Sequence, residues 1–159
     1  MNVVRTALAA ALFLSSALFV GAIAGADDWG QALQWVDKYP SDKLGTNGTG
    51  LLDQPLFKRV LHRVLPKAEA ATLTKLTVES VVQQMGDYMV VHKCLAHNCP
   101  SEMAVVIVDV KKQQLWVGLF SREAQRTSTR WYGTAGDYFA LPEEIKKDFL
   151  QRQQTGNPQ

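Results

Sequence analysis

The chain has 159 residues, and its 17 lysines and arginines nearly balance 15 aspartates and glutamates, for a formal net charge of +2. The basic residues are scattered among acidic ones, which is not the pattern of a nucleic-acid-binding protein. The length suits one domain with a core that needs no covalent staple. The two cysteines are therefore expected to shape a site rather than to hold the fold.

Residues 1–26 have the pattern of a secretory signal peptide. Arg5 makes the start positive, residues 7–20 are apolar apart from two serines, and small residues allow cleavage after Ala24 or Ala26. An uncleaved membrane anchor is the alternative, but the apolar core is short for a bilayer span. We expect export to the periplasm without stable membrane insertion. Because Arg5 is the one charged residue removed, the net charge of the mature chain is +1.

A single domain is expected over residues 27–151, and it begins with helices. Apolar residues at helical spacing predict a short helix ended by Pro40, and they are Trp29, Leu33 and Val36. Asp53 is a candidate N-cap for a second helix, with Pro55 in its first turn. The apolar stripe of this helix is Leu56, Val60, Leu61, Val64 and Leu65. A third helix is predicted over residues 67–76.

The chain then becomes rich in strand-forming residues. Strands are predicted over residues 78–84, 88–93, 102–110, 115–120 and 127–132. The apolar run 102–110 is typical of a central strand buried on both faces. A last helix starts at Pro142, docks through Ile145, Phe149 and Leu150, and precedes a polar tail at residues 152–159. This order predicts an α+β fold, an antiparallel sheet of about five strands with helices packed on it.

Cys94 and Cys99 enclose a short loop with His97 near its apex. Exported proteins meet oxidising conditions, and four intervening residues let the two cysteines form a disulfide. Two alternatives remain open. His92 together with the cysteines and His97 offers four metal ligands, although contiguous ligands fit a tetrahedral site poorly. A reactive thiol is the other alternative, although the spacing is not Cys-x-x-Cys.

A clamped loop that carries an imidazole suits insertion into the cleft of another protein, because little freedom is lost on docking. The imidazole of His97 can donate to a carboxylate or bridge two of them. A solvated histidine without a role is the plainer alternative. We expect no catalysis, no cofactor and no bound metal, since the sequence has no Ser-His-Asp order, paired-carboxylate motif or phosphate-binding loop.

The loop Cys94-Leu95-Ala96-His97-Asn98-Cys99 resembles the protruding Cys-Lys-Pro-His-Asp-Cys loop of the Ivy family, the inhibitors of vertebrate lysozyme. The resemblance covers residues 78–133. Residues 101–108 are similar to the apolar strand that follows the loop in that family, and residues 116–121 resemble its Thr-Gly-Leu-Phe-Ser strand. Arg130-Trp131-Tyr132 occupies the position of the next strand of that family, which contains a tryptophan.

The resemblance implies a periplasmic α+β protein whose loop enters the active-site cleft of lysozyme. His97 would hydrogen-bond the two catalytic carboxylates there, which differ in pKa. Cys94 and Cys99 would clamp the loop. The remaining target-binding residues would be Leu95, Ala96 and Asn98, where the family has Lys, Pro and Asp.

These departures remove two charged side chains and a rigid ring from the loop, so the expected partner is either lysozyme or a lytic transglycosylase. Two other classes of protein are kept as alternatives. One is an envelope interaction domain without inhibitory activity, which a buried His97 would favour. The other is a metal-binding or redox protein that uses His92, His97 and the thiols, which would require reduced Cys94 and Cys99.

Overall fold

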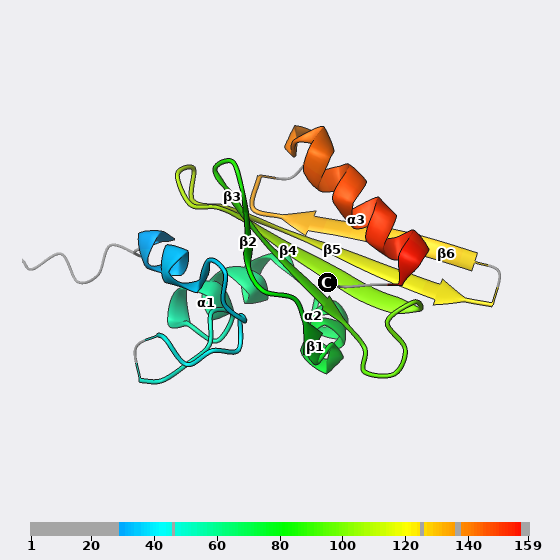
Figure 1. The fold of residues 1–159 in the computed structure, drawn as a ribbon, viewed down its shortest axis with the longest axis horizontal. Coiled ribbons are helices and arrows are strands. Elements are labelled where there is room, and N and C mark those ends of the chain that lie inside the picture. Colours follow the sequence, from blue (N-terminus) through cyan, green and yellow to red (C-terminus); the bar gives the residue numbers. More distant parts are fainter. Residues whose placement is uncertain (1–28, 46, 125, 136–137, 157–159) are drawn as a thin grey trace, which may run out of the picture.

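The computed structural model describes residues 29–45, 47–124, 126–135 and 138–156, so the expected signal peptide lies outside the described residues. A sheet separates two layers of helices (Figure 1). The helical elements are η1 (Trp29–Trp35), α1 (Pro55–Val64), α2 (Lys67–Lys75), η2 (Tyr138–Ala140) and α3 (Glu143–Thr155). The strands are β1 (Val78–Glu79), β2 (Gln83–Met85), β3 (Tyr88–Cys94), β4 (Glu102–Asp109), β5 (Gln114–Glu123) and β6 (Arg126–Gly133).

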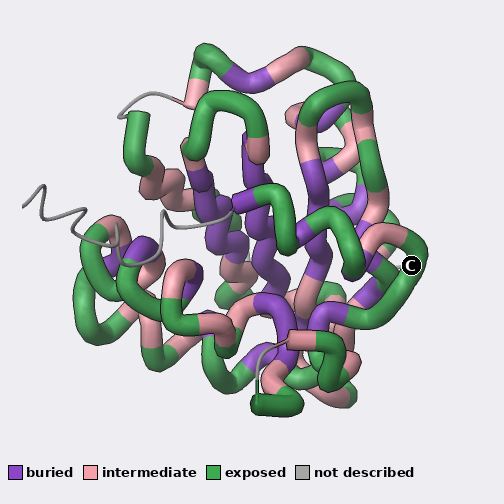
Figure 2. Tube along the Cα trace, turned by 90° about the vertical axis from the view of Figure 1, so that its left-hand side faces the viewer, coloured by how far each residue is buried: buried purple, intermediate pink, exposed green. Residues whose placement is uncertain are grey.

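The sheet has six strands in the order β1-β3-β4-β5-β6, with β2 also paired to β3. Every pairing between these strands is antiparallel, so the prediction of an α+β fold with an antiparallel sheet is confirmed. Strand β4 lies at the centre, where both neighbours satisfy its backbone. Strands β3, β4 and β5 are mostly buried, whereas the first half of β6, the outer helix faces and the loops are exposed (Figure 2).

Each face of the sheet has its own hydrophobic core. On β4, alternate residues belong to opposite cores: Val106 packs toward η1, α1 and α2, whereas Val105 and Ile107 pack toward α3. We call these the α1/α2-side core and the α3-side core. The predicted burial of this strand on both faces is confirmed. A polar contact also joins the sheet to the helices on one face, because Arg130 Nε of β6 donates to Glu69 Oε1 of α2 at 2.7 Å.

The first helix differs from the predicted pattern. It is a 3₁₀ helix, which repeats every three residues, so Trp29, Ala32 and Trp35 face the core. Leu33, expected in the buried stripe, is 47% exposed. The spacing of four that placed it in the stripe belongs to an α-helix, and the shorter period turns it outward.

Helix α1 starts as predicted with Pro55, but its cap does not match the prediction. Gln54, not Asp53, is the N-cap residue, and it makes no side-chain capping bond. The carboxylate of Asp53 instead pairs with Lys58 Nζ at 3.0 Å. The buried face of α1 also contains Phe57, which the predicted stripe did not include.

The strand predicted over residues 78–84 is divided into β1 and β2. The backbone of Val82 leaves β3 and bonds to the segment after η1: Asp37 N donates to Val82 O at 2.9 Å, and Val82 N donates to Lys38 O at 2.8 Å. Val82 is fully buried as a result. A partner distant in sequence, which strand propensity does not report, causes the division.

Helix α3 continues to Thr155, into the residues 152–159 where we expected a polar tail. Its buried face contains Ile145 and Phe149, as predicted, and then Arg152. Leu150, expected to dock, is 53% exposed because it lies on the opposite side of the helix. Arg152 stays inside because its guanidinium bonds to the Asp148 carboxylate one helical turn earlier.

Candidate functional site

Cys94 and Cys99 form a disulfide, with Cα atoms 4.8 Å apart. Cys94 is fully buried, and Cys99 packs partly buried against the same α3-side core. The predicted bond is confirmed, and it leaves no thiol for the metal-site and reactive-cysteine alternatives. Within the described ranges, no group of three or more histidine, cysteine, aspartate or glutamate side chains is arranged to hold a metal ion.

The loop between β3 and β4 is folded into two consecutive tight turns. In the first, Asn98 N donates to Leu95 O at 2.9 Å. In the second, Asn98 O accepts from Ser101 N at 3.0 Å and from Glu102 N at 3.2 Å. Leu95 N donates to Glu102 O at 3.0 Å and closes the base. The backbone of the loop is therefore fixed by hydrogen bonds as well as by the disulfide.

His97 stands at the apex of the first turn. Its φ of 63° is left-handed, a region in which histidine is found more often than most residues that have a Cβ. His97 and Asn98 are exposed, whereas Ala96 is half-buried. Leu95 is half-buried and packs against the α1/α2-side core. Of the predicted target-binding residues, His97 and Asn98 are thus presented to solvent and Leu95 anchors the loop.

Two contacts that the sequence does not indicate brace the loop, one from the end of α3 and one from Arg122 of β5. Gly156 ends α3 with a left-handed φ of 69°, and a Cβ at this position would lie 2.7 Å from Pro100 Cγ. Arg122 N donates to Ser101 O at 2.8 Å, and its guanidinium donates to Gln153 O at 2.9 Å. A glycine just after a helix is a recognisable end signal, but its contact with the loop depends on the fold.

His92 lies apart from the apex and inside the protein. Its side chain is 0% exposed, its Nε2 lies 2.8 Å from Asp148 Oδ2, and its ring stacks on Phe149. Burial lowers the pKa of His92, although the contact with Asp148 opposes the shift. His92 is therefore neutral at neutral pH, and it joins β3 to α3 close to the base of the loop.

Asp148 is the ionised member of this group. Burial raises the pKa of its carboxyl, but the hydrogen bonds from His92 and Arg152 outweigh burial and lower it to about 2. Because His92 is neutral, Arg152 supplies the compensating positive charge, with Nε 3.0 Å from Asp148 Oδ2. Arg152 also donates to the side-chain oxygen of Gln83 on β2. The sequence indicates His92 as a possible ligand beside the loop, but it contains no local signal for Asp148 or Arg152.

Comparison with known families assigns the chain. The family model described as Inhibitor of vertebrate lysozyme (Ivy) matches residues 57–156, more than half of the 159 residues. The chain belongs to the Ivy family. The match extends on both sides of the 78–133 range, from within α1 to the end of α3. No curated protein and no solved structure gives a significant match.

Membership of the Ivy family indicates the functional class of the protein. Ivy proteins are inhibitors and not enzymes, and the partner of the family is lysozyme. The exposed histidine loop lies within the matched region, as do both elements that brace it. None of the helices in the described ranges is long and apolar enough to cross a membrane.

Proposed function

We propose that this protein is exported to the periplasm and inhibits lysozyme or a related muramidase by plugging the active-site cleft with the loop from Cys94 to Cys99. One observation carries the proposal: His97 is exposed at the apex of a loop whose two ends are joined by a disulfide. Such a loop loses little conformational entropy on binding, so little of the free energy of its contacts is offset by the cost of ordering the loop.

The chemistry of the apex suits a cleft lined by carboxylates. An imidazole donates through one ring nitrogen when neutral and through both when protonated. Hydrogen bonds to ionised carboxylates are short and strong, and His97 would occupy the place of the substrate while it makes them. Asn98, exposed beside it, adds an uncharged amide that both donates and accepts. The half-buried Ala96 would contact the wall of the cleft.

The central experiment measures inhibition of a vertebrate lysozyme by the mature protein and by two variants. His97→Ala removes the imidazole, and His97→Asn removes it while keeping a side chain that tolerates the left-handed backbone. Both should weaken inhibition about tenfold to hundredfold, because a hydrogen bond to a charged group contributes about 1.5–3 kcal/mol. His62→Ala, which removes an exposed histidine of α1, is the matched control and should inhibit like wild type.

The same panel should include lytic transglycosylases, because Leu95, Ala96 and Asn98 differ from the family loop. Unchanged inhibition by both folded His97 variants would remove this residue from the mechanism. A folded wild type that inhibits no muramidase would favour the envelope interaction domain. For localisation, the expected result is that the processed chain fractionates with periplasmic proteins and that deletion of residues 1–26 retains it in the cytoplasm.

A further inference from the structure

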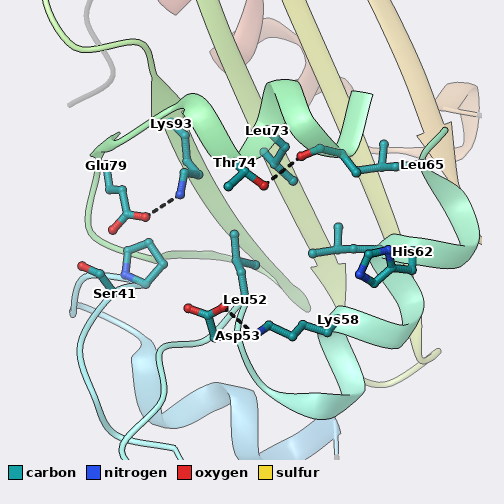
Figure 3. Close-up of a pocket in the computed structure, with 13 residues that line it drawn as sticks. Ser41, Leu52, Asp53, Lys58, His62, Leu65, Leu73, Thr74, Glu79 and Lys93 are labelled. Carbon is teal, nitrogen blue, oxygen red and sulfur yellow. Dashed lines mark hydrogen bonds and ion pairs between the residues drawn. The ribbon is translucent and has the colours of Figure 1, made fainter. Parts of the chain in front are cut away.

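A pocket away from the loop apex has no role in the proposed inhibition. It opens between α1, α2 and the sheet edge made by β1 and β3, and it encloses about 300 Å³ (Figure 3). That volume lies at the lower end of the range for small-molecule sites. Most side chains around it belong to ion pairs or are aliphatic, and Ser41, His62 and Thr74 add further polar groups.

The innermost polar group is an ion pair between neighbouring strands. Lys93 Nζ of β3 lies 2.6 Å from Glu79 Oε1 of β1, and their side chains are only 13% and 12% exposed. Charges so far from solvent are costly unless their remaining hydrogen-bonding capacity is used. The bond to Glu79 uses one of the three N–H donors of the Lys93 ammonium.

A second ion pair lies at the mouth. Asp53 Oδ1 and Lys58 Nζ are 3.0 Å apart, and their side chains are 65% and 56% exposed. In Figure 3 the Glu79–Lys93 and Asp53–Lys58 pairs lie at separate edges of the pocket with Leu52 between them, and Leu65 lies across from Glu79 and Lys93. Each pair is neutral as a unit, so each offers the pocket both signs of charge.

Most of the remaining wall is aliphatic. Leu65 and Leu73 are buried, and half-buried side chains complete a surface that receives an apolar group; the aliphatic lining is Leu52, Leu61, Leu65, Ala70 and Leu73. A ligand that fits must therefore combine a head group of both charges with a compact hydrocarbon body.

We propose that this pocket binds a small apolar zwitterion, an α-amino acid of about the size of leucine. The ligand ammonium bonds to the Glu79 and Asp53 carboxylates, and the ligand carboxylate bonds to the Lys93 and Lys58 ammonium groups. The side chain packs on the aliphatic wall. A simple anion or cation would meet one attractive and one repulsive partner in each pair, whereas a zwitterion meets an attractive partner for both of its charges.

The test uses the mature protein and four probes in isothermal titration calorimetry. L-Leucine is expected to bind. 4-Methylpentanoate lacks the ammonium, 3-methylbutylamine lacks the carboxylate, and glycine lacks the hydrocarbon body. Each should bind at least about tenfold more weakly, because each loses one class of contact. No binding of millimolar leucine, or equal binding of 4-methylpentanoate, would overturn the proposal.

Variants locate the binding. The double variant Glu79→Gln with Lys93→Gln keeps the pocket neutral and should abolish leucine binding. Lys75→Gln on α2, outside the lining, is the control for loss of a lysine and should bind like wild type. Ala70→Met fills the aliphatic side without touching a charge and should also abolish binding. Circular dichroism confirms that each is folded. Undiminished binding by folded Ala70→Met would place leucine elsewhere and overturn the assignment.

Discussion

His92 and His97 lie close in sequence but in opposite surroundings. His97 is exposed at the loop apex, where a left-handed φ of 63° turns the chain back toward β4. His92 is fully buried between β3 and α3. The disulfide and the strand register separate the two environments, because His92 still pairs with Val105 of β4 while His97 lies beyond the last ladder pair. One histidine is therefore structural and the other is free to contact a partner.

The buried histidine makes the free energy of unfolding depend on pH. Because burial holds the pKa of His92 below its usual 6.5, the unfolded chain binds more protons than the folded protein in the range just below that value. The contribution of His92 to the free energy of unfolding is therefore complete above pH 6.5 and declines as the pH falls below that value. Asp148 also lowers the free energy of unfolding as the pH falls, in the range between its usual pKa of 3.8 and its folded-state pKa of about 2.

We predict that His92→Gln flattens this dependence. Urea unfolding of wild type should show stability falling from neutral pH to about pH 5, with a shallower slope in the variant. His62→Gln replaces an exposed histidine and should keep the wild-type slope. Identical slopes for wild type and His92→Gln would contradict the assignment of the acid sensitivity to His92.

Gly156 gives a second prediction for a single residue. Gly156→Ala should destabilise the fold by more than Gly86→Ala, although both glycines have left-handed φ values, 69° and 61°. Each substitution costs about 1 kcal/mol for its backbone conformation. Only Gly156 also places its new Cβ against Pro100, whereas a Cβ at Gly86 meets nothing within 4 Å. Denaturant unfolding measures the difference, and equal losses would mean that the contact with the loop is unimportant.

At the scale of elements, the β3–β4 loop has two kinds of restraint. The disulfide closes a small ring, and backbone bonds from Leu95, Asn98 and Ser101 hold the same residues without it. The chain-entropy model assigns about 2 kcal/mol to a ring of this size. The loop should therefore depend on the disulfide for its rigidity more than the domain does for its folding.

We predict that the double variant Cys94→Ala with Cys99→Ala folds but inhibits lysozyme less well than wild type. Alanine suits Cys94, which is fully buried, because it leaves no polar group unsatisfied. Thermal unfolding should show a modest loss of stability, and the off-rate from lysozyme should rise because the loop must be ordered on binding. A variant that cannot fold would show that the disulfide supports the whole domain.

At the scale of the whole molecule, one sheet with a core on each face supports the loop from both sides. Leu95 packs toward the α1/α2-side core and Cys94 toward the α3-side core. The His92–Asp148 contact ties β3 to α3, and the Arg130–Glu69 contact ties β6 to α2. The loop is therefore anchored in both layers, and its position depends on their joint packing against the sheet.

The small net charge leads to a prediction for binding kinetics. A formal net charge of +1, after loss of Arg5 with residues 1–26, provides little long-range attraction or repulsion. The association rate with lysozyme should change little between low and physiological salt, and loop variants should act mainly on the off-rate. Stopped-flow measurements at several ionic strengths test this. A steep fall of the association rate with salt would reveal a concentrated charged patch.

The features determined by the sequence alone are those that depend on neighbours in the chain. The order of helices and strands, the doubly buried strand β4 and the disulfide all follow from periodicity or short spacing, and the loop motif indicates the Ivy family. Features that depend on residues distant in the chain appear only in the structure. A 3₁₀ period exposes Leu33, and the packing of α3 exposes Leu150 while it buries Arg152.

The Asp148 partner of His92, the Pro100–Gly156 contact and the pocket around Lys93 and Glu79 had no local signal, because each joins segments that only packing brings together. Local propensities arise from the backbone and nearest side chains and can be read in order along the chain. Burial, pKa shifts and cavities arise from surroundings that exist only once the chain has folded.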